Sequence, residues 1–324
     1  MDQTLLEIKD NNLTDVRIAE VLFSPAWDLE RTTKFMQHIW VPFAYKLTFV
    51  YLFIVYFGQK WMAKRRAVDN GTMSGVLAIW NFGFSFFSGY ASWCLLPELL
   101  HIIKRRGFIG SYCDNANYYT DPITGFWGWM FVMSKAPELG DTLFLILRKR
   151  PVIFLHWYHH ALTFIYATIT YAERQAWCRW SLALNLTVHT IMYFYFGLQA
   201  LKIKTPRPVA KFITTIQILQ FIISCYIFVQ LLRIKVENTM RCDARQGFKI
   251  KNNFIFFSTL NWNVLTFGAL MYLSYLYLFG QFFYNSYISP KDKNFKKRII
   301  LDPIISNGLK NGILETEKCN KKDK

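Results

Sequence analysis

The sequence predicts an all-α integral membrane protein, and two observations carry this prediction. Hydrophobic residues make up 53% and aromatic residues 18% of the chain, whereas charged residues make up only 18%, below the roughly 25% of soluble domains. The charged residues are also confined to short clusters between apolar stretches of about 20 residues, the length of a helix that crosses a bilayer. One polytopic membrane domain is therefore favoured over two soluble domains.

Seven stretches are long and apolar enough to be transmembrane helices. They cover residues 39–58, 75–99, 126–147, 152–171, 180–201, 209–232 and 254–283. We expect three regions in the chain: a lumenal tail over residues 1–37, a seven-helix membrane domain over residues 38–284, and a cytosolic, lysine-rich tail over residues 285–324.

The basic residues indicate the direction in which the chain crosses the membrane. A net charge of +17 often points to nucleic acid, but here Lys and Arg lie in loops and in the C-terminal tail, with no nucleic-acid-binding motif near them. If the N-terminus is lumenal, 21 basic residues lie on the cytosolic side and 15 on the other side. This bias favours a lumenal N-terminus and a cytosolic C-terminus. Basic loops could also attract substrates that carry phosphate groups.

Three short features fit a location in the endoplasmic reticulum membrane. Cys113 and Cys242 fall in two loops that are lumenal in this topology, where an oxidising compartment would let them form a disulfide; two unrelated free thiols are the alternative. Asn12 begins an Asn-Leu-Thr glycosylation triplet in the lumenal tail. Lys321 and Lys322 resemble a dilysine retrieval signal at a cytosolic C-terminus.

Polar residues inside the third span require an explanation, because a charge at the centre of a span costs roughly 2.5–3.5 kcal/mol. Lys135, Glu138, Asp141 and Thr142 follow a spacing of three and four, so they share one helix face. Either an ion-pair network between helices or an active site would explain them. Pro137 should kink this helix.

The fourth span carries three histidines on one face. His156, His159 and His160 are spaced i, i+3 and i+4. A lone histidine in a membrane helix is usually a hydrogen-bonded packing residue, but three that share a face indicate a functional site.

The fifth and sixth spans add polar residues at helical spacing. Asn185, His189 and Tyr193 lie in the fifth span, and Gln217 and Gln220 in the sixth, where glutamine pairs also serve to join helices. Lipid cannot satisfy these groups, so the polar faces should meet in a shared interior.

Two kinds of chemistry fit this set. A di-iron centre of the membrane desaturase type needs more histidines than the six of this chain, but a single zinc held by three histidines stays open. Alternatively, a neutral imidazole can act as nucleophile or base and accept an acyl group. Carboxylates at Glu138 and Asp141 would then fix histidine tautomers, and the amides of Asn185, Gln217 and Gln220 would stabilise an oxyanion. No dinucleotide-binding loop is present, so we expect no cofactor.

Four segments in this order resemble the very-long-chain fatty acid elongases, the ELO family of 3-oxoacyl-CoA synthases. They are KAPELGDT at 135–142, HWYHH at 156–160, N-x-x-x-H-x-x-M-Y at 185–193 and T-x-x-Q-x-x-Q at 214–220. The resemblance implies condensation of a fatty acyl-CoA with malonyl-CoA to give 3-oxoacyl-CoA, carbon dioxide and CoA, with no metal and no nicotinamide. It also implies seven helices, six of them around an acyl tunnel that is closed toward the lumen.

The resemblance further implies roles for individual residues. His159 would take the acyl group, His189 would act beside it as a base or positioning group, and His156 and His160 would polarise the site. Lys135, Glu138, Asp141 and Asn185 complete the expected catalytic set. We expect the substrates to contact Thr142, Tyr193, Gln217 and Gln220 and a basic rim of Arg148, Lys149, Lys202, Lys204 and Arg207.

The same resemblance bears on the substrate and on partners. The KAPELGDT segment and Trp157 in the histidine segment resemble those of the family branch that extends saturated, monounsaturated or methyl-branched chains. Phe196 departs from the family pattern, which commonly has a tyrosine there, so a hydrogen bond at that point is lost. The reductases and dehydratase of the elongation cycle are possible partners. A membrane zinc hydrolase and a seven-span receptor or transporter are the alternatives from other classes.

Overall fold

The structure, a computed structural model, describes residues 27–237, 242 and 260–289, and every regular element in these residues is a helix. The helices are α3 (Leu29–Phe35), α4 (Val41–Ala63), α5 (Gly71–Cys113), α6 (Pro122–Glu138), α7 (Gly140–Leu147), α8 (Phe154–Ala172), α9 (Cys178–Ala200), α10 (Arg207–Glu237) and α11 (Trp262–Phe283). Two short π-helical segments, η1 (Met36–Trp40) and η2 (Tyr284–Ile288), precede α4 and follow α11.

Capping residues explain where several helices begin. The side chain of Asn70 accepts a hydrogen bond from the backbone N–H of Met73 at 2.9 Å and so starts α5. Asp121 does the same for α6. The first residue of α6 is Pro122, and its missing N–H costs nothing there because the N–H at this position has no partner within a helix. Asn261 caps α11 through the backbone N–H of Asn263.

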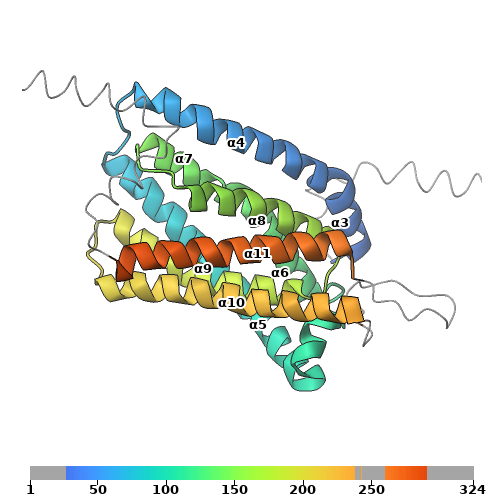
Figure 1. The fold of residues 1–324 in the computed structure, drawn as a ribbon. Helices are drawn as coiled ribbons and strands as arrows, with labels where there is room; N and C mark the ends of the chain where they lie inside the picture. Colours follow the sequence, from blue (N-terminus) through green and yellow to red (C-terminus); the bar gives the residue numbers. More distant parts are fainter. Residues whose placement is uncertain (1–26, 238–241, 243–259, 290–324) are drawn as a thin grey trace, which may run out of the picture.

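Most of the helices lie alongside one another in an elongated bundle. In Figure 1, α4, α8, α11 and α10 run side by side across the view, and α5 crosses behind them. These neighbours are in contact, and the most extensive contact of all joins α5 to α9. The connections that follow α4, α7 and α9 lie at one end of the bundle, on the left of Figure 1.

Four helical stretches are long and apolar enough to cross a membrane: Leu29–Ala63, Gly71–Cys113, Arg207–Glu237 and Trp262–Ile288. Large apolar side chains such as Phe49, Phe86 and Trp93 are 74–79% exposed on their outer faces. Exposure on this scale fits a surface that meets lipid. The protein is therefore a multi-pass membrane protein.

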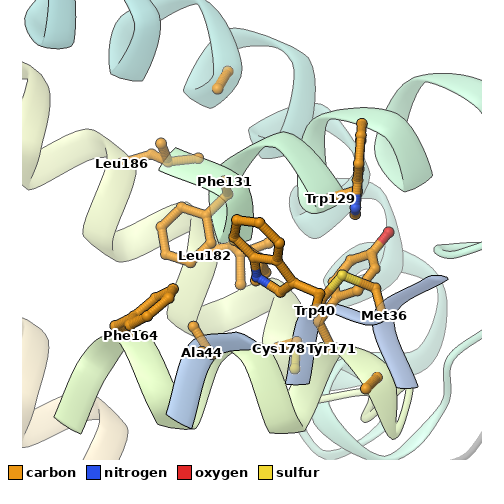
Figure 2. Packing of buried hydrophobic residues seen from close by; sticks show 14 of the residues in the cluster. Met36, Trp40, Ala44, Trp129, Phe131, Phe164, Tyr171, Cys178, Leu182 and Leu186 are labelled. Atoms are coloured by element: carbon orange, nitrogen blue, oxygen red, sulfur yellow. The ribbon is translucent and has the colours of Figure 1, made fainter. Parts of the chain in front are cut away.

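A core of large side chains joins η1, α4, α6, α8 and α9. Figure 2 shows Met36 and Trp40 packed among Trp129, Phe164 and Tyr171. Met36, Trp129 and Phe164 are fully buried. Because lipid tails are as apolar as these side chains, close van der Waals packing rather than transfer from water holds such helices together.

Two expected spans differ from the observed helices. The span expected over residues 75–99 continues to Cys113, because Ile102, Tyr112 and Cys113 keep an inner, buried face; Gly107, at φ 72°, interrupts this extension. The span expected over residues 126–147 is two helices, since α6 ends at Glu138 and α7 begins at Gly140, just after Pro137. The other five expected spans each contain one long helix.

The end of α5 is covalently tied to a distant segment. Cys113 and Cys242 form a disulfide with an S–S distance of 2.14 Å, across 129 residues of sequence. Several predictions lie outside the described residues: the glycosylation triplet at Asn12, the lysines Lys321 and Lys322, the start of the seventh span, and most of both tails.

Candidate active site

Helix α8 brings its three histidines together. The ring centroids of His156 and His160 are 4.5 Å apart, and those of His159 and His160 are 5.7 Å apart. The three histidines therefore share one face of α8, as their spacing predicted. The three rings differ in their surroundings, however, and the differences separate their roles.

A buried network connects α6 to α9. The ammonium group of Lys135 donates to both carboxylate oxygens of Glu138, at 2.8 and 3.0 Å, and to Oδ1 of Asn185 at 2.9 Å. The amide nitrogen of Asn185 lies 3.0 Å from Nε2 of His189, and Ser134 donates to Glu138 at 3.2 Å. All five side chains are at least nine-tenths buried. Buried charges are tolerated when paired and hydrogen-bonded in this way.

The network fixes the tautomer of His189. Lysine can only donate, so the oxygen of Asn185 must face Lys135, and its amide N–H₂ must face His189. Nε2 of His189 therefore accepts, and in the neutral ring the proton sits on Nδ1. This Nδ1 lies 3.8 Å from Glu138 Oε2 and has no hydrogen-bond partner among the described residues. His189 thus offers a donor, rather than a base, at its free nitrogen.

Asp141 is held from two other helices. Trp80 on α5 donates to Oδ1 of Asp141 at 2.6 Å, and the hydroxyl of Tyr193 on α9 donates to Oδ2 at 2.7 Å. The Trp80 ring also lies against Gly140, where an added Cβ would come within 3.2 Å of the ring. With both oxygens engaged, Asp141 fastens the start of α7 to α5 and α9.

Thr142 lies next to Asp141 and positions one ring of the histidine segment. Its hydroxyl is 3.0 Å from Nε2 of His156 and 2.8 Å from the hydroxyl of Tyr51 on α4. His156 is therefore engaged at one nitrogen.

His159 is the histidine of α8 that lines a cavity. The cavity has a volume of about 40 Å³, and Asn185 and Gln220 line it together with His159. The His159 ring packs against Tyr275 with centroids 4.8 Å apart, and the Tyr275 hydroxyl donates to the His159 carbonyl at 3.1 Å. In the described part of the chain the His159 ring nitrogens have no hydrogen bond. They are therefore free to react with a molecule in the cavity.

Gln217, which was expected at the site, faces elsewhere, and so does Thr214 of the same motif. Gln217 donates its amide to the sulfur of Met192 at 3.3 Å, and Thr214 is 3.3 Å from the hydroxyl of Tyr287 in η2. Neither lines the cavity. Both instead join helix α10 to its neighbours, which is the alternative role that glutamines serve in membrane helices.

Four of the five basic residues of the expected rim lie in the connections that follow α7 and α9, on the left of Figure 1, and Arg207 is the first residue of α10. Two of the five have partners within the protein. Arg148 pairs with Asp69 at 2.9 Å, and this hydrogen bond lowers the pKa of the Asp69 carboxyl. Lys149 donates to the carbonyls of Ala63 and Arg65. The remaining three are exposed: Lys202 and Lys204 in the connection after α9, and Arg207 at the start of α10.

Sequence reasoning missed three aromatic residues at the site. Tyr51, Trp80 and Tyr275 bond to Thr142, Asp141 and His159, but each lies in an apolar helix that has many similar aromatic residues. A buried Tyr or Trp usually finds a partner for its polar atom, which is a general signal but does not say which partner. In the described residues no three His, Cys, Asp or Glu side chains are grouped so that they could hold a metal ion.

Comparisons with known proteins agree with the motifs. The ELO: GNS1/SUR4 family model matches residues 34–295. Long chain fatty acid elongase 2 of Caenorhabditis elegans is 57% identical over 274 residues, which are 85% of this chain and 93% of that protein. Very long chain fatty acid elongase 6 of Drosophila melanogaster is 36% identical over 262 residues, 81% of this chain and 77% of that protein.

The likeness extends to a mammalian relative. Very long chain fatty acid elongase 6 of Mus musculus is 33% identical over 282 residues, 87% of this chain and 98% of that protein. No solved structure matches the chain. The family model covers most of the helical bundle and the whole site, the relatives each match more than four-fifths of the chain, and the chain belongs to the ELO (GNS1/SUR4) family.

Proposed function

We propose that this protein condenses a long-chain fatty acyl-CoA with malonyl-CoA through an acyl group carried on His159. Family membership supports the overall reaction, which yields 3-oxoacyl-CoA, carbon dioxide and CoA. The observation that supports His159 as the carrier is its place in the structure. Of the three rings on α8 it is the one that lines the cavity, and it does so beside two amide side chains.

The first half-reaction transfers the acyl group to the protein. A ring nitrogen of neutral His159 attacks the thioester carbonyl, and the C–S bond breaks. The ring proton leaves with the sulfur, so CoA departs as a free thiol. The amides of Asn185 and Gln220 line the same cavity and can donate to the oxyanion of the tetrahedral intermediate.

The second half-reaction forms the carbon–carbon bond. Malonyl-CoA loses carbon dioxide, and the electron pair of the broken bond attacks the acyl carbon on His159. The imidazole leaves as an anion and takes up a proton from solvent, which restores neutral His159, and 3-oxoacyl-CoA is released. The Nδ1–H of His189 is suited to hold the malonyl carboxylate or the enolate oxygen, because it is a buried donor with no other hydrogen bond in the described residues.

The surrounding architecture in this proposal follows the family pattern. Seven membrane spans leave the N-terminus lumenal and the C-terminus in the cytosol, within the endoplasmic reticulum membrane. The membrane domain covers residues 38–284, and its helices enclose an acyl tunnel that contains the cavity. The cavity holds only about three waters, at roughly 10–15 Å³ each, so an acyl chain must displace side chains as it enters.

The basic rim supports binding of CoA phosphates at the cytosolic end. Lys202, Lys204 and Arg207 are the better candidates, since Arg148 and Lys149 already have partners within the protein. Arginine and lysine are the usual partners of phosphate groups.

A condensation assay tests the reaction and its key residue. Purified protein is supplied with palmitoyl-CoA and labelled malonyl-CoA, without nicotinamide, beside the His159→Ala variant and the His101→Ala control, whose histidine is exposed on α5. We expect labelled 3-oxoacyl-CoA from the wild type and the control and none from His159→Ala. No product from folded wild-type protein, across saturated, branched and unsaturated acyl-CoAs, would contradict the proposal.

The two alternative functions predict other results for the same purified protein. A zinc hydrolase would contain stoichiometric zinc and lose activity with a chelator. A receptor or transporter would keep its function in the His159→Ala variant.

A further inference from the structure

The cavity beside His159 has two unlike ends. Helices α8 and α9 are joined by the short segment 173–177 and form a hairpin. His159 and Asn185 line the cavity near the open end of the hairpin, and Thr170, Trp177 and Cys178 line it near the turn. A chain that is attached to His159 and lies in the cavity therefore points toward the turn.

Trp177 is the largest side chain at the closed end. It is only 1% exposed, and its ring packs edge-on against Phe228 of α10, with centroids 5.9 Å apart. Tyr166 and Tyr272 line the cavity on the way to it.

Three hydrogen bonds from outside the hairpin hold its turn. Gln37 donates to the carbonyl of Ala172 at 3.2 Å, Asn115 to that of Arg174 at 2.8 Å, and Tyr119 to that of Gln175 at 2.8 Å. These donors come from η1 and from the segment between α5 and α6. The closed end is thus tied to two other parts of the protein.

Arg179 adds a second tie directly after the turn. Its guanidinium is 1% exposed and donates to Glu98 and to the carbonyls of Ser111 and Asn115, both at 2.9 Å. These carbonyls flank Cys113, whose disulfide with Cys242 fastens the same segment. The closed end cannot move away without breaking several buried contacts.

We infer that Trp177 is the stop that meets the methyl end of the acyl chain and sets the longest chain that this protein extends. This inference rests on the proposed function. Thr170 lies eleven residues beyond His159, a helical distance of about 16 Å at a rise of 1.5 Å per residue. With C–C bonds of about 1.5 Å in a zigzag, that distance holds roughly twelve bonds. A path of this length takes a long rather than a very long acyl chain.

A graded substitution series tests the stop. Trp177→Phe, Trp177→Leu and Trp177→Ala are assayed for condensation with saturated acyl-CoAs that differ by two carbons. We expect the longest accepted chain to grow by two to four carbons along the series. For the first chain beyond the wild-type limit, kcat/KM should rise at least tenfold, whereas the value for shorter chains should stay within about threefold.

Two further variants control the series. Trp180→Phe changes a tryptophan three residues away that bonds to Ser111 and does not line the cavity, so the chain-length limit should not move. Cys178→Met adds volume at the closed end and should shorten the longest accepted chain. Trp177→Phe keeps the aromatic contact with Phe228 and allows the test even if the smaller residues prevent folding.

The results separate this inference from the proposed function. A wild-type protein that condenses no acyl-CoA contradicts the proposed function. A wild-type protein that condenses them, with a chain-length limit that is the same in Trp177→Phe and in every folded variant at Trp177, contradicts the stop alone. So does an equal loss of activity at all chain lengths.

Discussion

Two basic side chains are fully buried in the part of the chain that the structure describes, and their surroundings differ. Arg179, near the closed end of the cavity, donates to Glu98 and to backbone carbonyls, and this network ends on groups that hold the fold. Lys135, at the site, is bound by Glu138 and Asn185, and its network passes on to His189 and ends on a nitrogen without a partner. The arginine network closes on the backbone and so stabilises structure, whereas the lysine network ends on the buried donor to which we assign the substrate contact in the proposed reaction.

Removing the arginine should have the largest effect on stability. Arg179→Met leaves Glu98 and the carbonyls of Ser111 and Asn115 without their donor, and breaking a buried pair in this way costs about 3–5 kcal/mol. Thermal unfolding in detergent measures the loss. Arg233→Met is the matched control, because its pair with Glu237 is exposed and should contribute less than about 1 kcal/mol. Equal shifts for the two variants would contradict the comparison.

Changing the amide at the site should affect catalysis far more than stability. Asn185→Asp keeps an acceptor for Lys135 but removes the donor to His189, so the ring proton can move from Nδ1 to Nε2. We expect kcat to fall by about 10²–10³, the usual loss when one oriented donor is removed.

A second buried asparagine serves as the control for that variant. Within the described ranges the Asn81 side chain bonds to the carbonyl of Leu77 alone, at 2.7 Å, so Asn81→Ala should leave kcat within a few-fold of the wild type. A folded Asn185→Asp protein with full kcat would mean that the tautomer of His189 does not matter.

Loss of one hydrogen bond to Asp141 should reduce stability and activity by an intermediate amount. Tyr193→Phe and Trp80→Phe each remove one of the two donors to this carboxylate. A buried acceptor that loses its donor costs about 1–3 kcal/mol, so both variants should unfold at lower temperature, with a smaller loss of kcat than Asn185→Asp. If either variant lost activity as fully as His159→Ala at unchanged stability, Asp141 would have a direct part in the reaction.

Removing the exposed ion pair between Arg148 and Asp69 should change the unfolding temperature least. The hydrogen bond from Arg148 lowers the pKa of Asp69 below its ordinary value of 3.8, so the pair contributes stability above that pH and loses it as the pH falls through the folded-state pKa. In Asp69→Asn the difference in unfolding temperature from the wild type should be small at pH 7, vanish in acid and shrink with added salt. A difference that grows as the pH falls would contradict this sign.

Much of this arrangement could be predicted from the sequence. The apolar stretches located the long helices, and the spacing of three and four placed His156, His159 and His160 on one face. Periodicity says which side chains share a face, but not what they meet across the bundle. For that reason the tie from Asp141 to Trp80 and the turn of Gln217 toward Met192 were not foreseeable.

The predicted helix boundaries differ from the observed ones for another reason. The charges after Leu99 suggested that the second span ends there, yet α5 continues because its inner face stays apolar while the charges remain exposed. Pro137 predicted a kink, and the chain breaks into α6 and α7 directly after it, but the sequence did not show that Trp80 packs on Gly140 at the start of α7.

The most direct test of the acyl carrier is the mass of the intact protein after incubation with palmitoyl-CoA in the absence of malonyl-CoA. We expect one added palmitoyl group on His159, which disappears with hydroxylamine or on addition of malonyl-CoA and which His159→Ala lacks. An unmodified protein that nevertheless forms 3-oxoacyl-CoA when both substrates are present would contradict the acyl-histidine and favour direct transfer between the two substrates.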